Sequence, residues 1–391
     1  MKRGGSVSIA QDIMDQFAGT TGLSPANKSP RRYLWTDAFA VCNFLGLYLL
    51  TMDGRYRGLA VELIDQVHNV LGRHRADDPR TGWVSGLGEE EGRAHPTIGG
   101  LRIGKALNER KPDEPIDERL EWDQDGQYFH YLTKWMHALN RASTVIGDLT
   151  YNRWAMELAR AACVRFVYAS PYSAQKRMYW KMSIDLSYPL VASMGHHDPL
   201  DGYITYNQLQ AAGERGPAQP GSLDLKTEIR EMAGICKGKS WQTDDPLGLG
   251  GLLSDAYRVA QMIIHGTFGD IDLLKVLLDA SLQGLRSYMR GKPLKIQAAY
   301  RLAFRELGLS IGLRAVERLQ KLTGLHPALF GKDRELRALL STLDRHVPLG
   351  AEIEGFWIEE VNQASGTWTD HIDINMVMLA TSLAPEGYLT I

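Results

Sequence analysis

Apolar residues recur at the spacing of an α-helix along almost the whole 391-residue chain, and the alternation of a half-buried strand is hard to find. Some segments, such as FAVCNFLGLYLL, are apolar around most of their circumference, whereas ELRALLSTLDRH is striped. A helix that is apolar on every side must be buried on every side, and a striped helix faces water. Two concentric layers of helices would produce both kinds.

Short turns separate most of the predicted helices, which is typical of stacked helical hairpins rather than of alternating strands and helices. No internal self-similarity is strong enough to indicate a repeat family. The pattern predicts helices over residues 37–52, 56–73, 127–143, 152–168, 207–212, 223–233, 252–265, 270–288, 294–308, 311–323, 333–344 and 370–383.

Two long connections, residues 73–126 and 178–245, interrupt this pattern. Connections of this length in a compact domain are usually functional or disordered. Their tryptophans, tyrosines and histidines favour ordered loops over one mouth of the fold. We therefore expect a single domain, residues 1–391, with these loops at its open end.

Charge and composition exclude several classes of partner. A formal net charge of -2 gives none of the basic signature of a nucleic-acid-binding protein. The longest apolar stretch, residues 38–52, is shorter than the roughly 18 to 20 residues that a membrane helix needs, and no apolar region of a signal peptide follows the first residues. We expect a cytoplasmic protein that binds neither nucleic acid nor membrane.

The three cysteines, Cys42, Cys163 and Cys236, are far apart and lack the CxxC spacing of zinc and redox sites. Cys42 and Cys163 lie in apolar segments and are expected in the core. We therefore expect neither a metal nor another cofactor. The oligomeric state is not indicated by the sequence.

The stretch WDQDGQYFHYLTKW, residues 122–135, places two acids beside a tryptophan just before a predicted helix. One interpretation is structural: Asp125 caps the helix, and Asp123 interacts with its positive end. The other is functional, with these carboxylates presented to a sugar. On the helix, His130, Lys134 and His137 share a face by i, i+4 and i+7 spacing.

Acids and aromatic residues are neighbours in four places, which fits glycoside cleavage. That reaction uses one acid to protonate the leaving oxygen and a second carboxylate to activate water or to attack. Aromatic rings nearby would stack on the apolar faces of sugars. The four places are Trp35/Asp37, Trp122/Asp123/Asp125, Asp185/Tyr188 and Trp368/Asp370.

The tripeptide Trp-Thr-Asp occurs at both ends of the chain, at residues 35–37 and 368–370, where it opens the first and last strongly apolar helices. Two ordinary N-caps would explain the coincidence. A ring in which the first and last helices are neighbours would also explain it, with both acids at the same rim.

The densest polar cluster is SMGHHDPLDGY, residues 193–203. Its Asp-Pro and Asp-Gly pairs are ordinary turn dipeptides, which favours a surface turn. In a cleft, the same side chains would bind sugar hydroxyls, and Asp198 or Asp201 would supply a second catalytic carboxylate. The adjacent His196 and His197 do not have the spacing of a familiar metal site.

With its dozen predicted helices, its acids at helix starts in WTD and WDQDGQYFHY, and its loops with SIDLSYPL and SMGHHDPLDGY, the chain resembles the six-hairpin glycosidase superfamily. The resemblance implies an all-α (α/α)6 toroid of helical hairpins that binds a saccharide at its wide end. The superfamily includes inverting glycoside hydrolases and unsaturated-uronide hydrolases, and sugar 2-epimerases have a closely similar barrel. It implies no particular catalytic residue here.

The leading hypothesis is a glycoside hydrolase acting on an oligosaccharide or a modified sugar. Asp125 would be the general acid, and Asp185 or Asp198 the base. The substrate-binding residues would be Trp35, Asp37, Arg102, Trp122, Asp123, Tyr128, His130, Lys134, Trp135, His196, His197, Asp201, Trp368, Asp370 and His371.

Two alternatives stay open. A sugar epimerase or isomerase would shuttle a proton between two histidines across a pocket, drawn from His130, His196, His197 and His371, because the pKa of histidine suits that work. A non-catalytic carbohydrate-binding toroid is the third possibility, since a fold does not determine its function.

Overall fold

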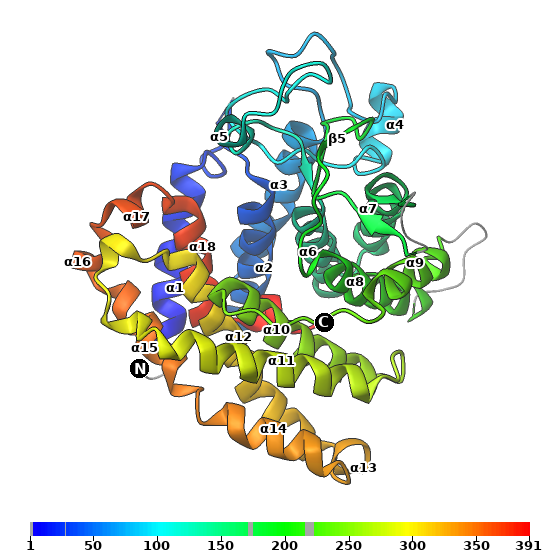
Figure 1. The fold of residues 1–391 in the computed structure, drawn as a ribbon. Helices are drawn as coiled ribbons and strands as arrows, with labels where there is room; N and C mark the ends of the chain where they lie inside the picture. Colours follow the sequence, from blue (N-terminus) through cyan, green and yellow to red (C-terminus); the bar gives the residue numbers. More distant parts are fainter. Residues whose placement is uncertain (1–2, 28, 171–174, 216–222) are drawn as a thin grey trace. The chain divides into compact units, whose positions relative to one another are not determined.

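The computed structural model describes residues 3–27, 29–170, 175–215 and 223–391, and Figure 1 traces its helices and strands. The prediction of an all-α fold is confirmed, because the described strands have only two or three residues each. The chain divides into two compact units. Unit 1 contains Met1–Phe17, Leu49–Met52 and Lys239–Ile391, and unit 2 contains Ala18–Tyr48 and Asp53–Gly238.

Unit 2 carries most of the residues predicted to bind a sugar. Its helices are α2 (Leu34–Thr51, whose last residues belong to unit 1), α3 (Gly54–Leu71), α4 (Glu89–Ala94), α5 (Glu118–Glu121), α6 (Phe129–Ile146), α7 (Leu149–Phe166), α8 (Asp198–Arg215) and α9 (Lys226–Cys236). Its strands are β1 (Gln127–Tyr128), β2 (Val167–Tyr168), β3 (Arg177–Met178), β4 (Lys181–Met182) and β5 (Pro189–Val191).

Helices α6 and α7 form a helical hairpin whose turn follows from its sequence. Gly147 ends α6 with φ 81°, the left-handed conformation that glycine adopts without strain. Asp148 then caps α7 by accepting a hydrogen bond from the backbone N–H of Thr150 at 2.9 Å. Helix α8 packs against both helices. These contacts confirm the prediction of helical hairpins within unit 2.

A small antiparallel sheet in the order β1-β4-β5 pairs the residues directly after the first long predicted loop with the second loop. Gln127 pairs with Met182, and Tyr128 pairs with Lys181. Strands β4 and β5 therefore lie within the second predicted loop. Residues 216–222 of the second segment lie outside the described part of the chain.

Unit 1 begins with α1 (Arg3–Thr20, whose last residues belong to unit 2). Its other elements are α10 (Pro246–Ile264), α11 (Ile271–Arg290), the 3₁₀ helices η1 (Pro293–Lys295) and η2 (Ala298–Tyr300), α12 (Ala303–Leu325), α13 (Pro327–Phe330), α14 (Arg334–Asp344), α15 (Pro348–Ile358), α16 (Glu360–Gln363), α17 (Gly366–Thr369), α18 (Ile372–Leu383) and α19 (Glu386–Leu389).

Glycines let α10 and α12 approach each other closely. A Cβ added to Gly250 would lie 1.9 Å from the carbonyl oxygen of Gly308, and one added to Gly312 would lie 2.7 Å from the Cα of Gly250. The two backbones are therefore in direct contact, and no larger residue fits between them.

One prediction for this part of the chain is wrong. The helices expected at 294–308 and 311–323 are instead η1, η2 and the single helix α12, which runs through Gly308 and Gly312. Arg301 and Leu302 are extended, so the helix begins after them. Gly308 and Gly312 lie within α12 as packing positions against α10. Helices α1 and α15 were not predicted.

The start of α8 was predicted nine residues too late. Residues 198–202, DPLDG, were expected to form a turn, but they are the first turn of α8. Proline is tolerated in the first helical turn because its missing N–H would have no partner there. Gly202 is a packing position within the helix, because a Cβ there would lie 3.0 Å from both Phe129 and Met232. The closed (α/α)6 ring itself stays a prediction.

Candidate functional site

The starts of α2, α6 and α8 lie next to one another in unit 2. The hydroxyl of Tyr33, just before α2, lies 2.7 Å from that of Tyr131 in α6. The Nδ1 atom of His130, also in α6, lies 3.8 Å from Oδ1 of Asp198 at the start of α8. Residues far apart in the sequence therefore meet at these three helix starts.

Aromatic rings gather at the start of α6, and we call them the aromatic cluster: Tyr33, Trp35, Trp122, Tyr128, Tyr131 and Trp180. The ring of Trp180, between β3 and β4, is nearly parallel to that of His130, with centroids 6.3 Å apart. Trp122 is 54% exposed, whereas Tyr128 and Trp35 are buried. The aromatic cluster thus contains both buried rings and rings that reach solvent.

Asp198 and His130 each keep a buried polar atom without a hydrogen-bond partner in the described structure. These atoms are Oδ2 of Asp198 and Nδ1 of His130. The side chain of Asp198 is 7% exposed and that of His130 is 28% exposed. Leaving buried polar groups unpaired costs free energy, so such groups are rare and need an explanation. A bound ligand that supplies the missing hydrogen bonds would explain these two atoms.

Burial brings the pKa of Asp198 close to neutrality. It raises the pKa to about 7, the negative charge of Asp201 contributes to the rise, and Lys134 opposes it. Burial also lowers the pKa of His130 to about 4. At pH 7, the imidazole is therefore neutral, while the carboxyl group is divided between its protonated and ionised forms.

The neighbouring Asp201 is held as an ion pair. Lys134 Nζ lies 2.9 Å from both carboxylate oxygens of Asp201, and the hydroxyl of Thr133 donates to the same carboxylate at 3.3 Å. Asp198 and Asp201, three residues apart on α8, are therefore in different states. One is held ionised by a cation, and the other is free to take up a proton.

Gly195 determines where the carboxyl group of Asp198 can lie. A Cβ at this position would be 2.4 Å from Cγ and from both carboxyl oxygens of Asp198. The carboxyl group therefore folds over a residue that has no side chain. The predicted polar cluster at 193–203 does contribute to this region, but through a helix start and a glycine rather than through a turn.

Asp125, the predicted general acid, is fully buried and bound on both oxygens. One accepts hydrogen bonds from the backbone N–H groups of Gly104 and Gly126, at 2.9 and 3.0 Å, and the other accepts one from Arg102 at 2.8 Å. It does not cap α6, whose N-cap is Tyr128. Asp125 and the predicted ligand Arg102 thus form part of the framework that joins residues 101–107 to β1.

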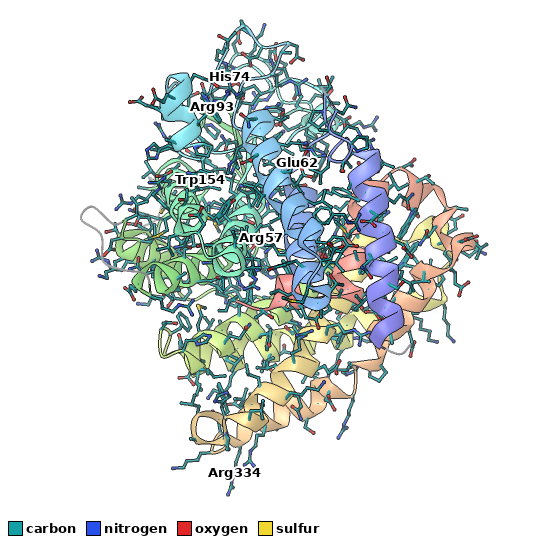
Figure 2. The ribbon with its side chains drawn as sticks, turned by 180° about the vertical axis from the view of Figure 1, so that it is seen from behind. Arg57, Glu62, His74, Arg93, Trp154 and Arg334 are labelled. Carbon is teal, nitrogen blue, oxygen red and sulfur yellow. The ribbon has the colours of Figure 1, made fainter. Side chains whose placement is uncertain are left out.

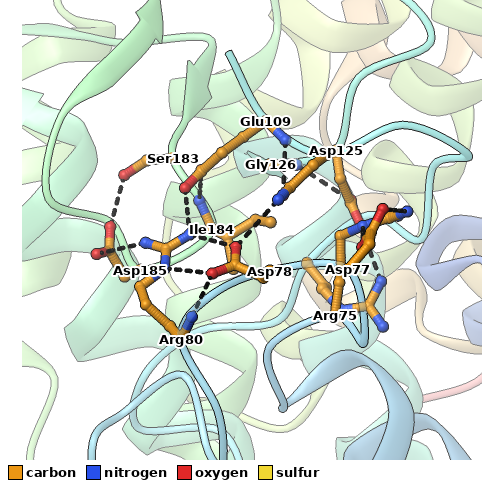
Figure 3. A network of polar contacts seen from close by, with 12 residues as sticks. Arg75, Asp77, Asp78, Arg80, Glu109, Asp125, Gly126, Ser183, Ile184 and Asp185 are labelled. Carbon is orange, nitrogen blue, oxygen red and sulfur yellow. Dashed lines mark hydrogen bonds and ion pairs between the residues drawn. The ribbon is translucent and has the colours of Figure 1, made fainter. Parts of the chain in front are cut away.

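Asp185, the other predicted carboxylate, belongs to a polar network around Arg80 (Figure 3). The guanidinium lies 2.9 Å from Asp185, 2.7 Å from Asp78 and 2.5 Å from Glu109. Burial acts to raise the pKa of Asp185, but hydrogen bonds from Ser187 and Ser183 and its contact with Arg80 lower it. Asp185 is therefore held ionised and is not a proton donor near neutral pH.

Trp135 is a core residue rather than part of the aromatic cluster. It is fully buried, and its Nε1 donates to Nε2 of His68 at 3.2 Å. The ring of Trp154, labelled in Figure 2, packs edge-on against His68 with centroids 5.1 Å apart. Burial lowers the pKa of His68 to about 3, in keeping with a neutral imidazole that accepts this bond.

The remaining predicted residues of unit 2 lie around these groups. Asp37 accepts hydrogen bonds from the backbone of Tyr33 and from Arg32, so it stabilises the start of α2. Asp123 is exposed beside Trp122. The rings of His196 and His197 lie 4.6 Å apart. Among the described residues, no group of three or more potential metal ligands occurs.

The three predicted residues near the C-terminus lie in unit 1. Trp368 is buried and stacked on Trp357, with ring centroids 5.7 Å apart. Asp370 is the C-cap of α17, and His371 is the N-cap of α18. The second Trp-Thr-Asp therefore does not open α18, which starts at Ile372. The neighbourhood of the two tripeptides stays a prediction.

Four residues of this region were not predicted as site residues from the sequence: Tyr33, Tyr131, Trp180 and Gly195. Tyr131 follows His130 in the quoted motif, so its position near the helix start could have indicated a role. Trp180 lies between two strands of two residues each, which are too short to show a periodicity. Nothing in the sequence pairs Gly195 with Asp198.

No family model matches the chain, and no curated protein matches it. A solved structure, a sugar epimerase from a ruminal bacterium, is 10% identical to it with a TM-score of 0.43. The likeness covers 81% of this chain and 75% of that chain. At this distance, it says nothing about the activity of this chain.

Proposed function

We propose that the chain is a carbohydrate-active enzyme in which Asp198 and His130 move protons to and from a sugar at the aromatic cluster. The observation that carries the proposal is the pair of buried polar atoms without hydrogen bonds, Oδ2 of Asp198 and Nδ1 of His130, beside these rings. Neither atom has a hydrogen-bond partner in the described structure, so both keep the hydrogen-bonding capacity that a substrate would use.

The protonation states of this pair suit general acid–base catalysis. A group whose pKa is near the working pH both donates and accepts protons readily. Asp198, with its pKa raised by burial to about 7, meets that condition. The imidazole of His130 is neutral at pH 7, so one ring nitrogen donates a hydrogen bond and the other accepts one.

The aromatic cluster favours a sugar as the substrate. Sugar rings have apolar C–H faces, which pack against aromatic rings, and hydroxyl edges, which need hydrogen-bond partners. Trp180 and Trp122 supply ring surface, and their centroids lie 5.4 Å apart. Asp198 and His130 supply the polar partners next to Trp180.

Epimerisation or isomerisation is the first candidate reaction. Both need an acid and a base that exchange protons with carbon or a hydroxyl, which matches a neutral imidazole beside a carboxyl group with a pKa near 7. Glycoside hydrolysis commonly needs a second carboxylate across the scissile bond. Asp125 and Asp185 are each bound to an arginine, which makes them poor choices for that role.

Glycoside hydrolysis is the second candidate. The general acid of a glycosidase has a raised pKa, so that it still carries a proton near neutral pH. Burial raises the pKa of Asp198 to about 7, which leaves part of this carboxyl group protonated there. Asp201, also at the start of α8, would then be the ionised carboxylate, held by Lys134 of α6.

Incubation of the protein with aldoses and oligosaccharides in D₂O separates these reactions. Proton transfer at carbon introduces deuterium into the sugar, whereas hydrolysis releases reducing ends without it. We expect Asp198→Asn and His130→Gln to lose about 10²- to 10⁴-fold in turnover. Asp113→Asn, which removes an exposed carboxylate in the same unit, serves as the control.

Wild-type turnover in both site variants would refute the proposal. Sugar binding with neither deuterium exchange nor cleavage would instead support the non-catalytic alternative.

A further inference from the structure

Lys105 is a cation without an acid partner at the edge of the aromatic cluster. Its Nζ lies 5.4 Å from the ring centroid of Tyr33, and the residue is half-buried. Within the described part of the chain, its ammonium group makes no hydrogen bond or ion pair. The other cations near the cluster are paired: Lys134 with Asp201, Lys181 with Glu121, and Arg32 with Asp37.

The backbone that carries Lys105 is held rigidly. Gly104 has φ +95°, and a Cβ there would lie 2.3 Å from the carbonyl oxygen of Arg32, so only glycine fits. Its N–H donates to Asp125 at 2.9 Å. Arg75 donates to the carbonyl oxygens of Lys105 and Ala106, at 2.5 and 2.8 Å.

The framework around Asp125 therefore holds the backbone at Lys105. Arg75 lies 3.5 Å from the carboxylate of Asp125, and Arg102 lies 2.8 Å from it. Asp77 holds Arg75 from the other side, at 2.7 Å. These four charged side chains neutralise one another and hold the segment, whereas the charge of Lys105 is not neutralised by an ion pair.

Two tyrosine rings connect Lys105 to the proposed catalytic pair. Tyr33 packs edge-on against Tyr131 with centroids 5.5 Å apart, and Tyr131 packs against His130 with centroids 4.8 Å apart. Lys105 and His130 therefore both lie beside the aromatic cluster. The charge of Lys105 also acts on this region, because it helps to lower the pKa of Lys181, after burial as the main cause.

We propose that Lys105 binds an anionic group, a carboxylate or a phosphate, on the sugar that the aromatic cluster receives. The inference rests on the proposed function for the place where the sugar lies, and it assigns the class of sugar. A half-buried ammonium group gains a charge-assisted hydrogen bond from such a group, and the bond is stronger than one to a neutral hydroxyl.

Equilibrium binding, followed by tryptophan fluorescence, tests the proposal. The probes are glucose, galactose and mannose, each in its neutral form, as the 6-carboxylate and as the 6-phosphate, together with inorganic phosphate. We expect at least one anionic sugar to bind about 10- to 100-fold more tightly than its neutral form, the range of a hydrogen bond to a charged group. The carboxylate and phosphate forms show which anion is recognised.

Lys105→Gln should abolish this preference, because glutamine still forms hydrogen bonds to a neutral hydroxyl but carries no charge. Lys111→Gln, which removes an exposed lysine from the same segment, should keep it. The preference should also shrink as salt is raised from about 10 mM to 1 M, because salt screens the attraction.

Equal affinities for neutral and anionic forms in the wild-type protein would overturn the proposal, as would a preference that survives in Lys105→Gln. Inorganic phosphate that binds as tightly as the sugar phosphates would also overturn it, since the site would then recognise the ion alone. Binding is read without turnover, so an anionic preference that depends on Lys105 would stand even if Asp198→Asn showed no catalytic defect. That combination would refute only the proposed function.

Discussion

Replacing Asp198 with asparagine should stabilise unit 2 at high pH, because the wild-type carboxylate is ionised there against the cost of burial. The folded-state pKa is about 7, and the ordinary value is 3.8. The folded state therefore binds the proton more tightly than the unfolded state does. This difference lowers the free energy of unfolding as pH rises from about 4 to 7, and the loss is complete above pH 7.

The size of the effect follows from the shift. About 3 pKa units at 1.36 kcal/mol per unit give about 4 kcal/mol. The asparagine side chain of the variant cannot ionise. The free energy of unfolding of the variant minus that of the wild type should therefore be about 4 kcal/mol larger at pH 8 than at pH 4. His130 changes stability in the opposite direction, because its lowered pKa costs stability below pH 6.5, but this effect is common to both proteins.

Urea denaturation between pH 4 and pH 8.5, followed by tryptophan fluorescence, measures this difference. Most tryptophans, including Trp135 and Trp180, lie in unit 2, so the signal reports mainly on that unit. Asp113→Asn is the control for loss of an exposed charge. A difference that stays flat with pH would show that Asp198 is not held in an unfavourable ionised state, and the reasoning would be refuted.

Two further substitutions test neighbouring parts of the site. Gly195→Ala should displace the carboxyl group of Asp198, and turnover should fall nearly as far as in Asp198→Asn while the melting temperature stays within a few degrees; unchanged turnover would contradict the assigned geometry. Asp125→Ala should destabilise the protein by about 3 to 5 kcal/mol, because it leaves the buried Arg102 without its carboxylate. Calorimetry measures this loss, and a change below about 1 kcal/mol would show that Asp125 is not part of the framework.

The helices could be predicted from the sequence wherever their apolar pattern was long. The pattern placed α2, α3, α6 and α7 within a few residues of their observed bounds. It failed at the start of α8, where the Asp-Pro pair was expected in a turn, and in α12, which was predicted as two shorter helices. Both outcomes depend on which side chains pack against these residues, and a local pattern does not contain that information.

The candidate site could be predicted only in part. The motif at residues 122–135 and the cluster at 193–203 did contain His130 and Asp198, which the structure brings together. The pattern could not show which acids are neutralised. Asp125 and Asp198 are both buried acids beside glycines, and the contacts of Asp125 with Arg102 and with two backbone N–H groups distinguish them.

The glycine contact between α10 and α12 limits how unit 1 can move. With the two backbones touching at Gly250 and Gly308, there is no layer of side chains that could change rotamer to let one helix slide along the other. Any hinge within unit 1 must therefore lie outside this pair of helices, and α10 and α12 would move together as one rigid body.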